Sequence, residues 1–401
     1  MSKIDDLIQE LCPDGVEYKP IREFADCLAG ATPKTKVKEF WDGGTIPWMS
    51  SGEVNKKIVT SVENYITQAG YDSCSTKMLP ANSVVIALAG QGKTRGTVAL
   101  TKISLCTNQS LCGIVLNNSK ILSSYLFHFL SSQYEQLRAI SSGDGTRGGL
   151  NLKMINAYLV PVPPIEVQEE IVRVLDSFAE LEAELEAELE ARRRQYVYYR
   201  DQLLTFNKPE ERELLSKSVK WVQLQQICDL SRGKVISKKY LADHNGEYPV
   251  YSSQTENNGV FGKIDTYMFD GEYLTWTTDG ANAGSIFHRE GKFSITNVCG
   301  LIKNKNEKEV LTRFLYYWLT ITAKSYVSAG MGNPKLMSGV MGSIEIPLPP
   351  LSEQQRIVDI LDKFDALVND ISQGLPAEIE ARRKQYEYYR DKLLTFKKKE
   401  N

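Results

Sequence analysis

The chain has 401 residues, and its 48 Lys and Arg against 50 Asp and Glu give a formal net charge of −2 at pH 7, so overall charge does not favour a nucleic-acid binder. This length suffices for two or three domains. No apolar run approaches the ~18 residues of a membrane span, and the N-terminus has no apolar signal core. Both observations predict a cytoplasmic protein. Seven scattered cysteines without a Cys-x-x-Cys pair, and only three histidines, argue against a disulfide framework and a metal site built on histidines.

Residues 1–160 form the first predicted globular head, in which strand-like runs such as 83–87 alternate with loops rich in glycine, hydroxyl and basic side chains. Between residues 30 and 160 there are 13 Lys and Arg against 7 Asp and Glu, an excess that suits a phosphate-contacting surface. Glycine lets backbone approach a ligand closely, and Arg, Lys and Gln read base edges. These loops are either ordinary hairpin turns or DNA contacts, and the second interpretation selects Thr32, Lys34, Lys36, Ser50, Ser51, Gln91, Lys93, Thr94, Arg95 and Arg147.

Residues 87–94 nearly spell a phosphate-binding loop. The pattern requires glycine at its first position, where this chain has Ala87. A helix must also follow, because its N-terminus supplies the anion site, but residues 95–101 are strand-like. We therefore interpret this segment as a loop between strands and not as a nucleotide site.

One long helix is predicted over about 166–205, because apolar residues recur there at helical spacing after the Pro163-Pro164 pair. Within it, residues 181–192 read Leu-Glu-Ala-Glu, Leu-Glu-Ala-Glu, Leu-Glu-Ala-Arg. This tandem is either a solvated acidic face of the helix or a repeat whose copy number sets the length of the helix. Each four-residue unit adds about 6 Å of helix, and DNA rises about 3.4 Å per base pair, so one unit corresponds to one or two base pairs.

A linker is expected at 207–218, and residues 219–346 form the second predicted head. Strand-like runs such as 273–276 are again separated by polar, glycine-containing loops. Isolated acids such as Asp279 and Glu290 do not assemble the carboxylate cluster that a Mg²⁺-dependent nuclease needs. These loops are again either ordinary hairpin turns or DNA contacts. The candidate DNA contacts of the second head are Arg232, Lys234, Lys238, Ser252, Ser253, Gln254, Thr278, Asn282, Asn333 and Lys335.

Residues 347–398 are predicted as a second helical region, which should break or kink at Gly374-Leu375-Pro376. Two long apolar stripes in one chain can cover each other, which predicts an intramolecular antiparallel coiled coil. Tyrosine clusters in both helices are either packing residues or sites for partner proteins. The partner-binding candidates are Gln195, Tyr196, Tyr199, Arg200, Gln385, Tyr386, Tyr389 and Arg390.

The helical segments are repeats of each other. Pro161-Val162-Pro163-Pro164-Ile165 returns as Pro347-Leu348-Pro349-Pro350-Leu351, and residues 191–206 return almost unchanged as 381–396. The two heads share little beyond their opening residues. A chain that keeps its helices and varies its heads is interpreted as one that recognises two different targets at a fixed separation.

These motifs resemble those of the specificity (S) subunits of type I restriction–modification systems. The resemblance is carried by residues 347–358 and 383–394, by their copies at 161–172 and 193–204, and by the segment 41–48. It implies an α+β fold with two α/β target-recognition domains, 1–160 and 219–346. Two conserved helical regions, 161–206 and 347–398, would pair as the antiparallel coiled coil.

The resemblance also implies a subunit without catalytic activity. Each head would read one half of a split, asymmetric DNA site, and the coiled coil would fix the gap. Two modification subunits, which bind S-adenosylmethionine, would dock on the helices, and two restriction subunits would add ATP- and Mg-dependent translocation and cleavage. No cofactor or metal is expected in this chain itself.

Two other classes of function compete with this interpretation. An enzyme with fused recognition domains, a nuclease or a methyltransferase, would need a catalytic constellation, and no Asn-Pro-Pro-Tyr-like methyltransferase signature is present. A structural coiled-coil adaptor that binds only proteins would leave the basic, glycine-rich loops unexplained.

Overall fold

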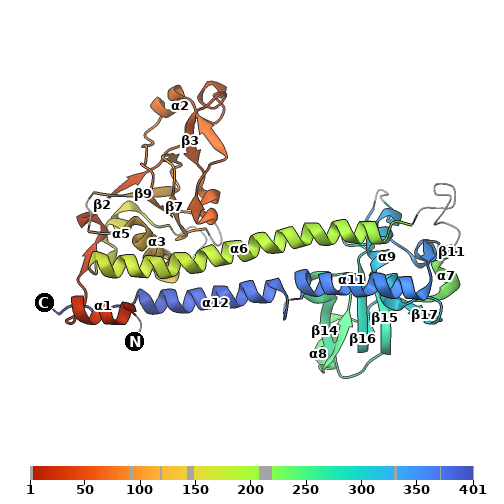
Figure 1. The fold of residues 1–401 in the computed structure, drawn as a ribbon. Helices are drawn as coiled ribbons and strands as arrows, with labels where there is room; N and C mark the ends of the chain where they lie inside the picture. The colour runs from red at the N-terminus through yellow and green to blue at the C-terminus, as the bar shows by residue number, and fades with distance from the viewer. Residues whose placement is uncertain are drawn as a thin grey trace. The chain divides into compact units, whose positions relative to one another are not determined.

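The computed structural model describes residues 3–90, 94–117, 120–141, 149–206, 219–328, 332–370 and 372–400. These residues fold into two compact units, Met1–Ala187 with Glu378–Asn401, and Glu188–Ala377. Each unit contains an α/β head and a pair of helices, and helix α6 (Ile165–Leu203) contributes to both (Figure 1). In the parts of the chain that are described, no helix is long and apolar enough to cross a membrane. The predicted linker 207–218 lies outside the described residues.

The first head is built on a five-stranded sheet of order β2-β9-β6-β7-β4, a three-stranded sheet of order β5-β3-β8, and the antiparallel pair β1-β10. Its strands are β1 (Tyr18–Pro20), β2 (Ala25–Ala29), β3 (Ile46–Met49), β4 (Ile58–Val59), β5 (Asn64–Ile66), β6 (Val84–Ala87), β7 (Val98–Thr101), β8 (Cys106–Thr107), β9 (Leu111–Leu116) and β10 (Leu159–Pro161). Its helices are α1 (Lys3–Leu11), η1 (Ile21–Glu23), η2 (Lys38–Phe40), η3 (Ser51–Lys56), α2 (Gln68–Asp72), α3 (Ser123–Ser132), α4 (Tyr134–Ile140) and α5 (Leu152–Ala157).

Strand β6 shows how the first head is held together, because all four of its side chains are buried. Successive residues of a strand point to opposite faces of the sheet. Val84 and Ile86 join the core that includes residues of α3 and α6. Val85 and Ala87 join a second core on the other face. Strand β7 follows the loop after β6, which confirms that a strand and not a helix comes after residues 87–94.

The second head is built on a six-stranded sheet of order β12-β17-β15-β16-β13-β14, with β11 and β18 as a separate antiparallel pair. Its strands are β11 (Lys220–Gln223), β12 (Cys228–Arg232), β13 (Tyr248–Tyr251), β14 (Val260–Ile264), β15 (Phe269–Thr277), β16 (Ile286–Ile295), β17 (Cys299–Asn304) and β18 (Glu345–Leu348). Its helices are α7 (Leu224–Ile227), α8 (Lys238–Asp243), η5 (Glu256–Gly259), α9 (Thr312–Thr322), η6 (Ala323–Tyr326) and α10 (Ser338–Gly342). Helix α9 packs on β15 and β16, where Leu274 and Trp276 are fully buried.

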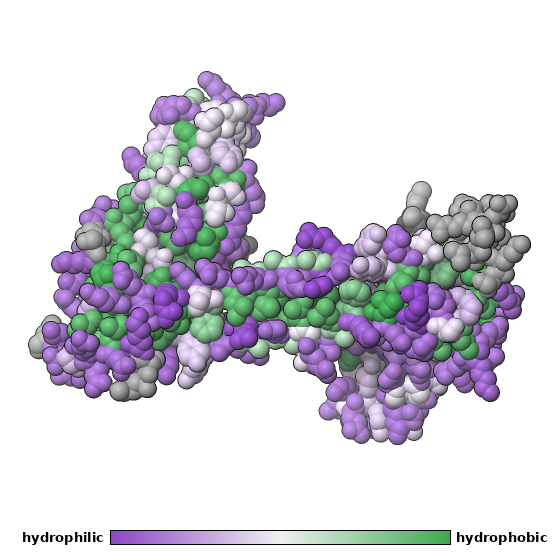
Figure 2. Space-filling view, in the orientation of Figure 1, coloured by the Kyte–Doolittle hydropathy of each residue, from purple (hydrophilic) through white to green (hydrophobic). Residues whose placement is uncertain are grey.

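The predicted antiparallel pairing of the helices is confirmed within each unit. The second helical region consists of two helices, α11 (Leu351–Asn369) and α12 (Leu375–Leu393). The break falls at Gly374, as the Gly-Leu-Pro motif predicts, and Gly374 donates its N–H to the Asp370 carbonyl at 3.0 Å. Proline is compatible with the first turn of α12, because a first-turn N–H has no helical acceptor. Figure 2 shows hydrophobic side chains gathered along the paired helices.

The helix pairs use the same aromatic contact twice. In the first unit the rings of Phe178 on α6 and Tyr389 on α12 stack at 5.4 Å. In the second unit Phe364 on α11 and Tyr199 on α6 stack at 5.6 Å. Phe178 and Phe364 occupy equivalent positions of the sequence repeat, as do Tyr199 and Tyr389. Helix α6 therefore supplies the phenylalanine of this contact in the first unit and the tyrosine in the second.

The joint between head and helix is also repeated. The buried Gln168 accepts from the Leu122 N–H at 2.9 Å and donates to the carbonyls of Lys120 and Pro163 at 2.9 and 2.7 Å. Gln354 accepts from the Leu311 N–H at 2.9 Å and donates to two carbonyls, of Glu309 at 3.1 Å and Pro349 at 2.9 Å. Buried backbone groups need such partners, so each glutamine fixes its head at the start of its helix.

Candidate DNA interface

In the first head, several loops selected from the sequence leave the five-stranded sheet at the same end. The end of β2 pairs with the start of β9, since Ala29 lies opposite Cys112. The end of β6 also pairs there, since Ala87 lies opposite Leu111. The loops after β2 and β6 therefore meet the turn before β9.

Strand β3 brings a further segment to this place. Asn108, in the turn before β9, donates its N–H to the Met49 carbonyl at 3.1 Å, and Ala31 donates to the Thr107 carbonyl at 2.9 Å. Trp48 Nε1 also donates to the Ala31 carbonyl at 3.0 Å. We call the described parts of segments 30–36, 49–51, 88–97 and 107–110 the first loop group.

The candidate side chains of the first loop group differ in what they contact. Thr32 Oγ1 donates to Gln109 Oε1. Gln109 was not among the residues predicted from the sequence. Ser50 caps η3 in a box with the buried Glu53 and so has a local structural role, while Ser51 is the first residue of η3. Lys34 and Lys36 are exposed, whereas Thr94 and Arg95 are half-buried. Gln91, Lys93 and Arg147 lie outside the described residues.

In the second head an equivalent set of segments converges. Strand β17 lies between β12 and β15, and its first two residues, Cys299 and Gly300, pair with Thr277 and Arg232. Lys234 forms a bridge with Thr296, whose hydroxyl donates to Ser252 Oγ at 3.1 Å.

The loop before α10 completes this set. Asp279 forms a backbone bridge with Lys335, and Leu336 donates its N–H to the Thr278 carbonyl at 2.9 Å. Gly280 also donates to the carbonyl of Pro334 at 3.0 Å. We call segments 232–235, 252–254, 278–284 and 332–335, together with Thr296, the second loop group.

Of the remaining candidates of the second head, all but Lys238 belong to this group. Asn282 and Asn333 belong to the group and are exposed. Ser253 is half-buried next to Ser252. Gln254 folds back to donate to the Val260 carbonyl of its own loop. Lys238 begins α8, which packs against the edge strand β14, and so lies apart from the group.

One close approach is common to both loop groups. A Cβ at Gly30 would overlap the carbonyl oxygens of Thr107 and Asn108, and a Cβ at Gly233 would overlap the carbonyl oxygen of Ile295. Both glycines follow the first strand of their sheet, so the chain turns tightly across the sheet end in each head. The two heads thus carry different side chains on a similar tight turn of the backbone, at Gly30 and at Gly233.

Sequence reasoning missed Asp279 as a site residue. Its carboxylate accepts from Arg232 Nη2 at 3.2 Å and from Thr278 Oγ1 at 2.6 Å. Lys335 Nζ lies 4.0 Å from its other oxygen. An isolated acid carries no spacing signal, and only the strand order places it between two basic residues.

The partner-binding candidates are largely engaged within the chain. Besides Tyr199 and Tyr389, the ring of Tyr196 lies 6.4 Å from that of Phe364. The Tyr386 hydroxyl lies 3.1 Å from His128 Nδ1, and burial raises the pKa of Tyr386 to about 12. Arg200 and Arg390 each pair with the following aspartate, and Gln195 and Gln385 each accept from the arginine three residues earlier.

Two tyrosines next to these candidates remain exposed. Tyr198 is 61% exposed and Tyr388 is 62% exposed, and they occupy equivalent positions of the repeat. Each ring packs edge-on against the next tyrosine, at 5.4 Å in both copies. The repeat therefore presents the same aromatic feature once in each unit.

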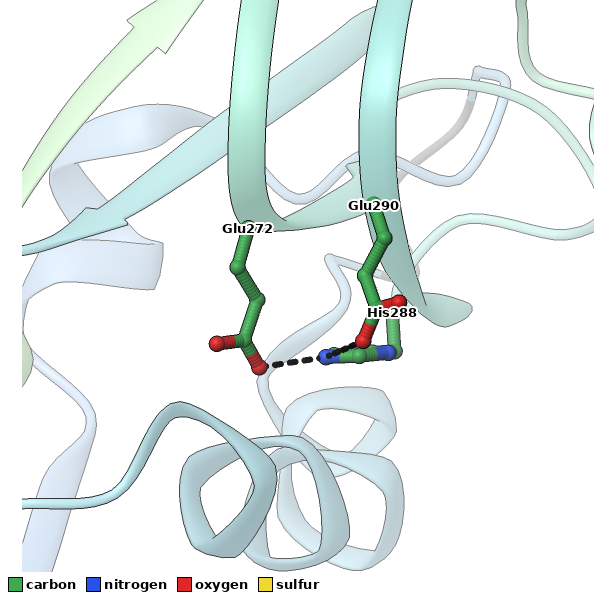
Figure 3. A group of neighbouring side chains, drawn as sticks. All are labelled: Glu272, His288 and Glu290. Carbon is green, nitrogen blue, oxygen red and sulfur yellow. Dashed lines mark hydrogen bonds and ion pairs between the residues drawn. The ribbon is translucent and has the colours of Figure 1, made fainter.

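Among the described residues, one group has the composition of a metal site. Glu272 on β15 and His288 and Glu290 on β16 point toward one another (Figure 3). His288 Nε2 lies 2.6 Å from a Glu272 oxygen and 3.8 Å from a Glu290 oxygen. A hydrogen bond and an ion pair thus account for the arrangement. The group lies well back along β15 from its end at Thr277, and so apart from the second loop group.

The chain therefore holds two different heads, each with a polar loop group at one sheet end and each fixed to a repeated pair of helices. The chain matches the type I restriction modification DNA specificity domain twice, over residues 13–191 and 217–381. It therefore belongs to the family of type I restriction–modification specificity subunits.

Individual relatives agree with this assignment. The chain is 30% identical to the EcoR124I/EcoR124II specificity subunit of Escherichia coli, across 96% of this chain and 95% of the relative. It is 44% identical to a type I specificity subunit of Mycoplasma pneumoniae over 229 residues, which are 57% of this chain and 89% of the relative. The crystal structure of the S subunit from M. genitalium has a similar fold, with a TM-score of 0.61 at 16% identity, covering 95% and 96% of the two chains.

Proposed function

We propose that this specificity subunit reads a split, asymmetric DNA site, with one half recognised by each head. The observation that carries the proposal is the placement of a loop group at the equivalent sheet end of both heads. These groups hold Arg, Lys, Thr and Ser side chains, which donate to base edges and phosphates. Because the side chains of the two groups differ, the two halves of the site should differ in sequence.

The helices are proposed to set the gap between the halves. Helix α6 is one uninterrupted helix of 39 residues that carries the Leu-Glu-Ala-Glu tandem and contributes to both units. A rigid helix transmits a change of length as a change of separation. Removing one four-residue unit shortens it by about 6 Å, which corresponds to one or two base pairs.

The chain is further proposed to be non-catalytic and to recruit two modification subunits, one on each repeated helical surface. Tyr198 and Tyr388 support this, because exposed aromatic side chains are enriched at protein interfaces. Adenine methylation would then use S-adenosylmethionine bound by the modification subunits. Cleavage and ATP-driven translocation, with Mg²⁺, would belong to two restriction subunits.

Methylation mapping tests the proposal. The chain is co-expressed with its modification partner, and methylated adenines are mapped on plasmid DNA. We expect two short sequence blocks around an unspecified gap. A continuous motif would contradict two-headed reading. No methylation despite a stable complex with the partner would favour the protein-only adaptor.

A further inference from the structure

We propose that Asp279 determines specificity in the second head by holding the Arg232 guanidinium in one direction, so that Arg232 reads a guanine in the second half of the DNA site. The inference deepens the proposed function and rests on it. Guanine is the base concerned because its major-groove edge presents two acceptors, O6 and N7, that match the arginine fork.

The contacts of Arg232 leave part of its guanidinium available for a base. Its two bonds to the described residues, to Thr278 Oγ1 at 2.9 Å and to Asp279 Oδ2 at 3.2 Å, both start from Nη2. A guanidinium has five N–H donors in a rigid plane. Thr278 Oγ1 and Asp279 Oδ2 lie only 2.6 Å apart, so both occupy one side of Nη2 and leave its second hydrogen available. That hydrogen and the adjacent N–H, on Nη1 or Nε, form a fork of fixed direction that can donate to a pair of acceptors.

The surroundings restrict both partners. Thr278 is fully buried, and its hydroxyl also donates to Asp279 at 2.6 Å. The side chains of Arg232 and Asp279 are only 34% and 25% exposed. Gly233 passes so close to the end of β16 that no side chain fits there, which limits backbone movement directly after Arg232. The pair is thus pre-organised, as recognition of a planar edge requires.

Charge distinguishes base reading from backbone binding. A carboxylate between Arg232 and Lys335 cancels one of their two positive charges and repels DNA phosphates. A surface designed only to hold the phosphate backbone gains nothing from it. A base edge carries no net charge, so the same carboxylate does not oppose base contact and improves the orientation of the arginine.

A purely structural role makes a different prediction. Asp279 also joins the β15 end to the loop before α10 through its backbone bridge with Lys335. If the carboxylate served only to close this loop, its loss would lower stability and weaken binding to all DNA sequences alike. The two roles therefore differ in whether selectivity at one base pair changes.

The test uses the full chain in complex with its modification partner and duplexes carrying the mapped site. Each base pair of the second half is replaced in turn, and binding is measured for wild type, Arg232→Lys and Asp279→Asn. Asp279→Asn keeps the side-chain volume, and melting temperatures check folding. The matched control is Asp229→Asn. Asp229 lies on β12, as Arg232 does, and its carboxylate is 69% exposed and pairs with Lys305.

We expect Arg232→Lys to reduce discrimination at one G·C pair of the second half by about 10- to 100-fold. Asp279→Asn should reduce discrimination at the same pair by about 5- to 10-fold. Selectivity in the first half and the behaviour of Asp229→Asn should match wild type.

Two results for Asp279→Asn would overturn the proposal. Equally stronger binding to every duplex would indicate phosphate contacts, because a carboxylate that repels phosphates is lost. Equally weaker binding to every duplex would indicate a role that only closes the loop. Unchanged discrimination in a folded variant would also overturn it. A wild-type complex that selects no split site would instead contradict the proposed function, so the two failures are distinguishable.

Discussion

At the residue scale, one buried glutamine holds each head on its helix. Gln168 bonds to backbone groups of the loop before α3, and Gln354 bonds to those of the loop before α9. Gln354 faces one N–H and two carbonyls, while the side chain of its exposed neighbour Gln355 donates to Asp359 Oδ1 at 2.7 Å. This pair of adjacent glutamines offers a direct comparison of a buried and a solvated amide.

Gln354→Ala should lower the free energy of unfolding of the second unit by about 2–3 kcal/mol, because three backbone groups lose their partners in a buried place. Gln355→Ala should cost less than about 0.5 kcal/mol. Urea denaturation followed by tryptophan fluorescence measures both. Equal effects of the two substitutions would show that the joint does not depend on the buried amide.

Glu170 provides a prediction for pH dependence. Its side chain is 6% exposed and accepts from Arg173 Nη2 at 2.6 Å and from Lys3 Nζ at 2.9 Å. Hydrogen bonds from Arg173 and Lys3 lower the pKa of Glu170 from 4.5 to about 2. A lowered pKa in the folded state stabilises the fold above the unfolded-state value, and this stabilisation disappears as pH falls toward the folded-state value.

Glu170→Gln should therefore be less stable than wild type at pH 7, and the difference should shrink between about pH 5 and pH 3. Urea denaturation at pH 7, 5 and 3 gives the free energies of unfolding. A difference that stayed constant, or that grew on acidification, would mean that the charged form of Glu170 is not what stabilises the joint between α1 and α6.

At the element scale, the repeated tyrosines differ in their contacts: Tyr199, although 41% exposed, and Tyr389 each stack on a phenylalanine of the facing helix, whereas Tyr198 and Tyr388 are 61% and 62% exposed. Tyr199→Ala and Tyr389→Ala should each lower the free energy of unfolding by about 1–2 kcal/mol, because each removes a stacked aromatic pair. Thermal or urea unfolding of each variant measures this cost. Loss of partner binding without loss of stability would contradict a packing role for these two residues.

The exposed tyrosines should behave in the opposite way. The double substitution Tyr198→Ala and Tyr388→Ala should change stability by less than about 0.5 kcal/mol for each residue and should weaken binding of the modification subunits. Size-exclusion chromatography of the mixed subunits compares the complexes formed by wild type and variant. Unchanged complex formation would place the partner surface elsewhere on the helices.

The extent of the helices could be predicted from the sequence, because their apolar spacing, the Pro-Pro pairs and Gly374-Leu375-Pro376 are local signals. Helix α6 begins at Ile165 and ends at Leu203, close to the predicted 166–205. Which tyrosine packs could not be predicted in the same way. Tyr196, Tyr198 and Tyr199 lie within one turn, and only the position of the facing helix selects among them.

The loop groups depend on long-range strand order and were predictable only as separate loops. Arg232 and Thr278 are 46 residues apart in the sequence, yet both lie beside the start of β17. Alternating hydrophobicity predicts that strands exist but not which strands are neighbours. Asp279 was missed for this reason, and Ser50 was selected although it serves as a helix cap.

At the scale of the whole molecule, the proposed function requires that the helices set the distance between two independent heads. The Leu-Glu-Ala-Glu tandem is suited to this role, because deleting one four-residue unit leaves the same sequence pattern in a shorter helix. Arg383 pairs with Glu182 at 3.0 Å and with Glu186 at 3.4 Å. Deleting residues 185–188 brings Glu190 into the place of Glu186, so this contact of the helix pair is kept.

The most direct test is methylation mapping of the chain lacking residues 185–188, beside wild type and with the same modification partner. Both sequence blocks should stay the same, and the gap between them should shorten by one or two base pairs. A deletion variant that methylates the wild-type motif with an unchanged gap would contradict the proposed role of the helices. So would a variant that assembles normally but recognises altered blocks.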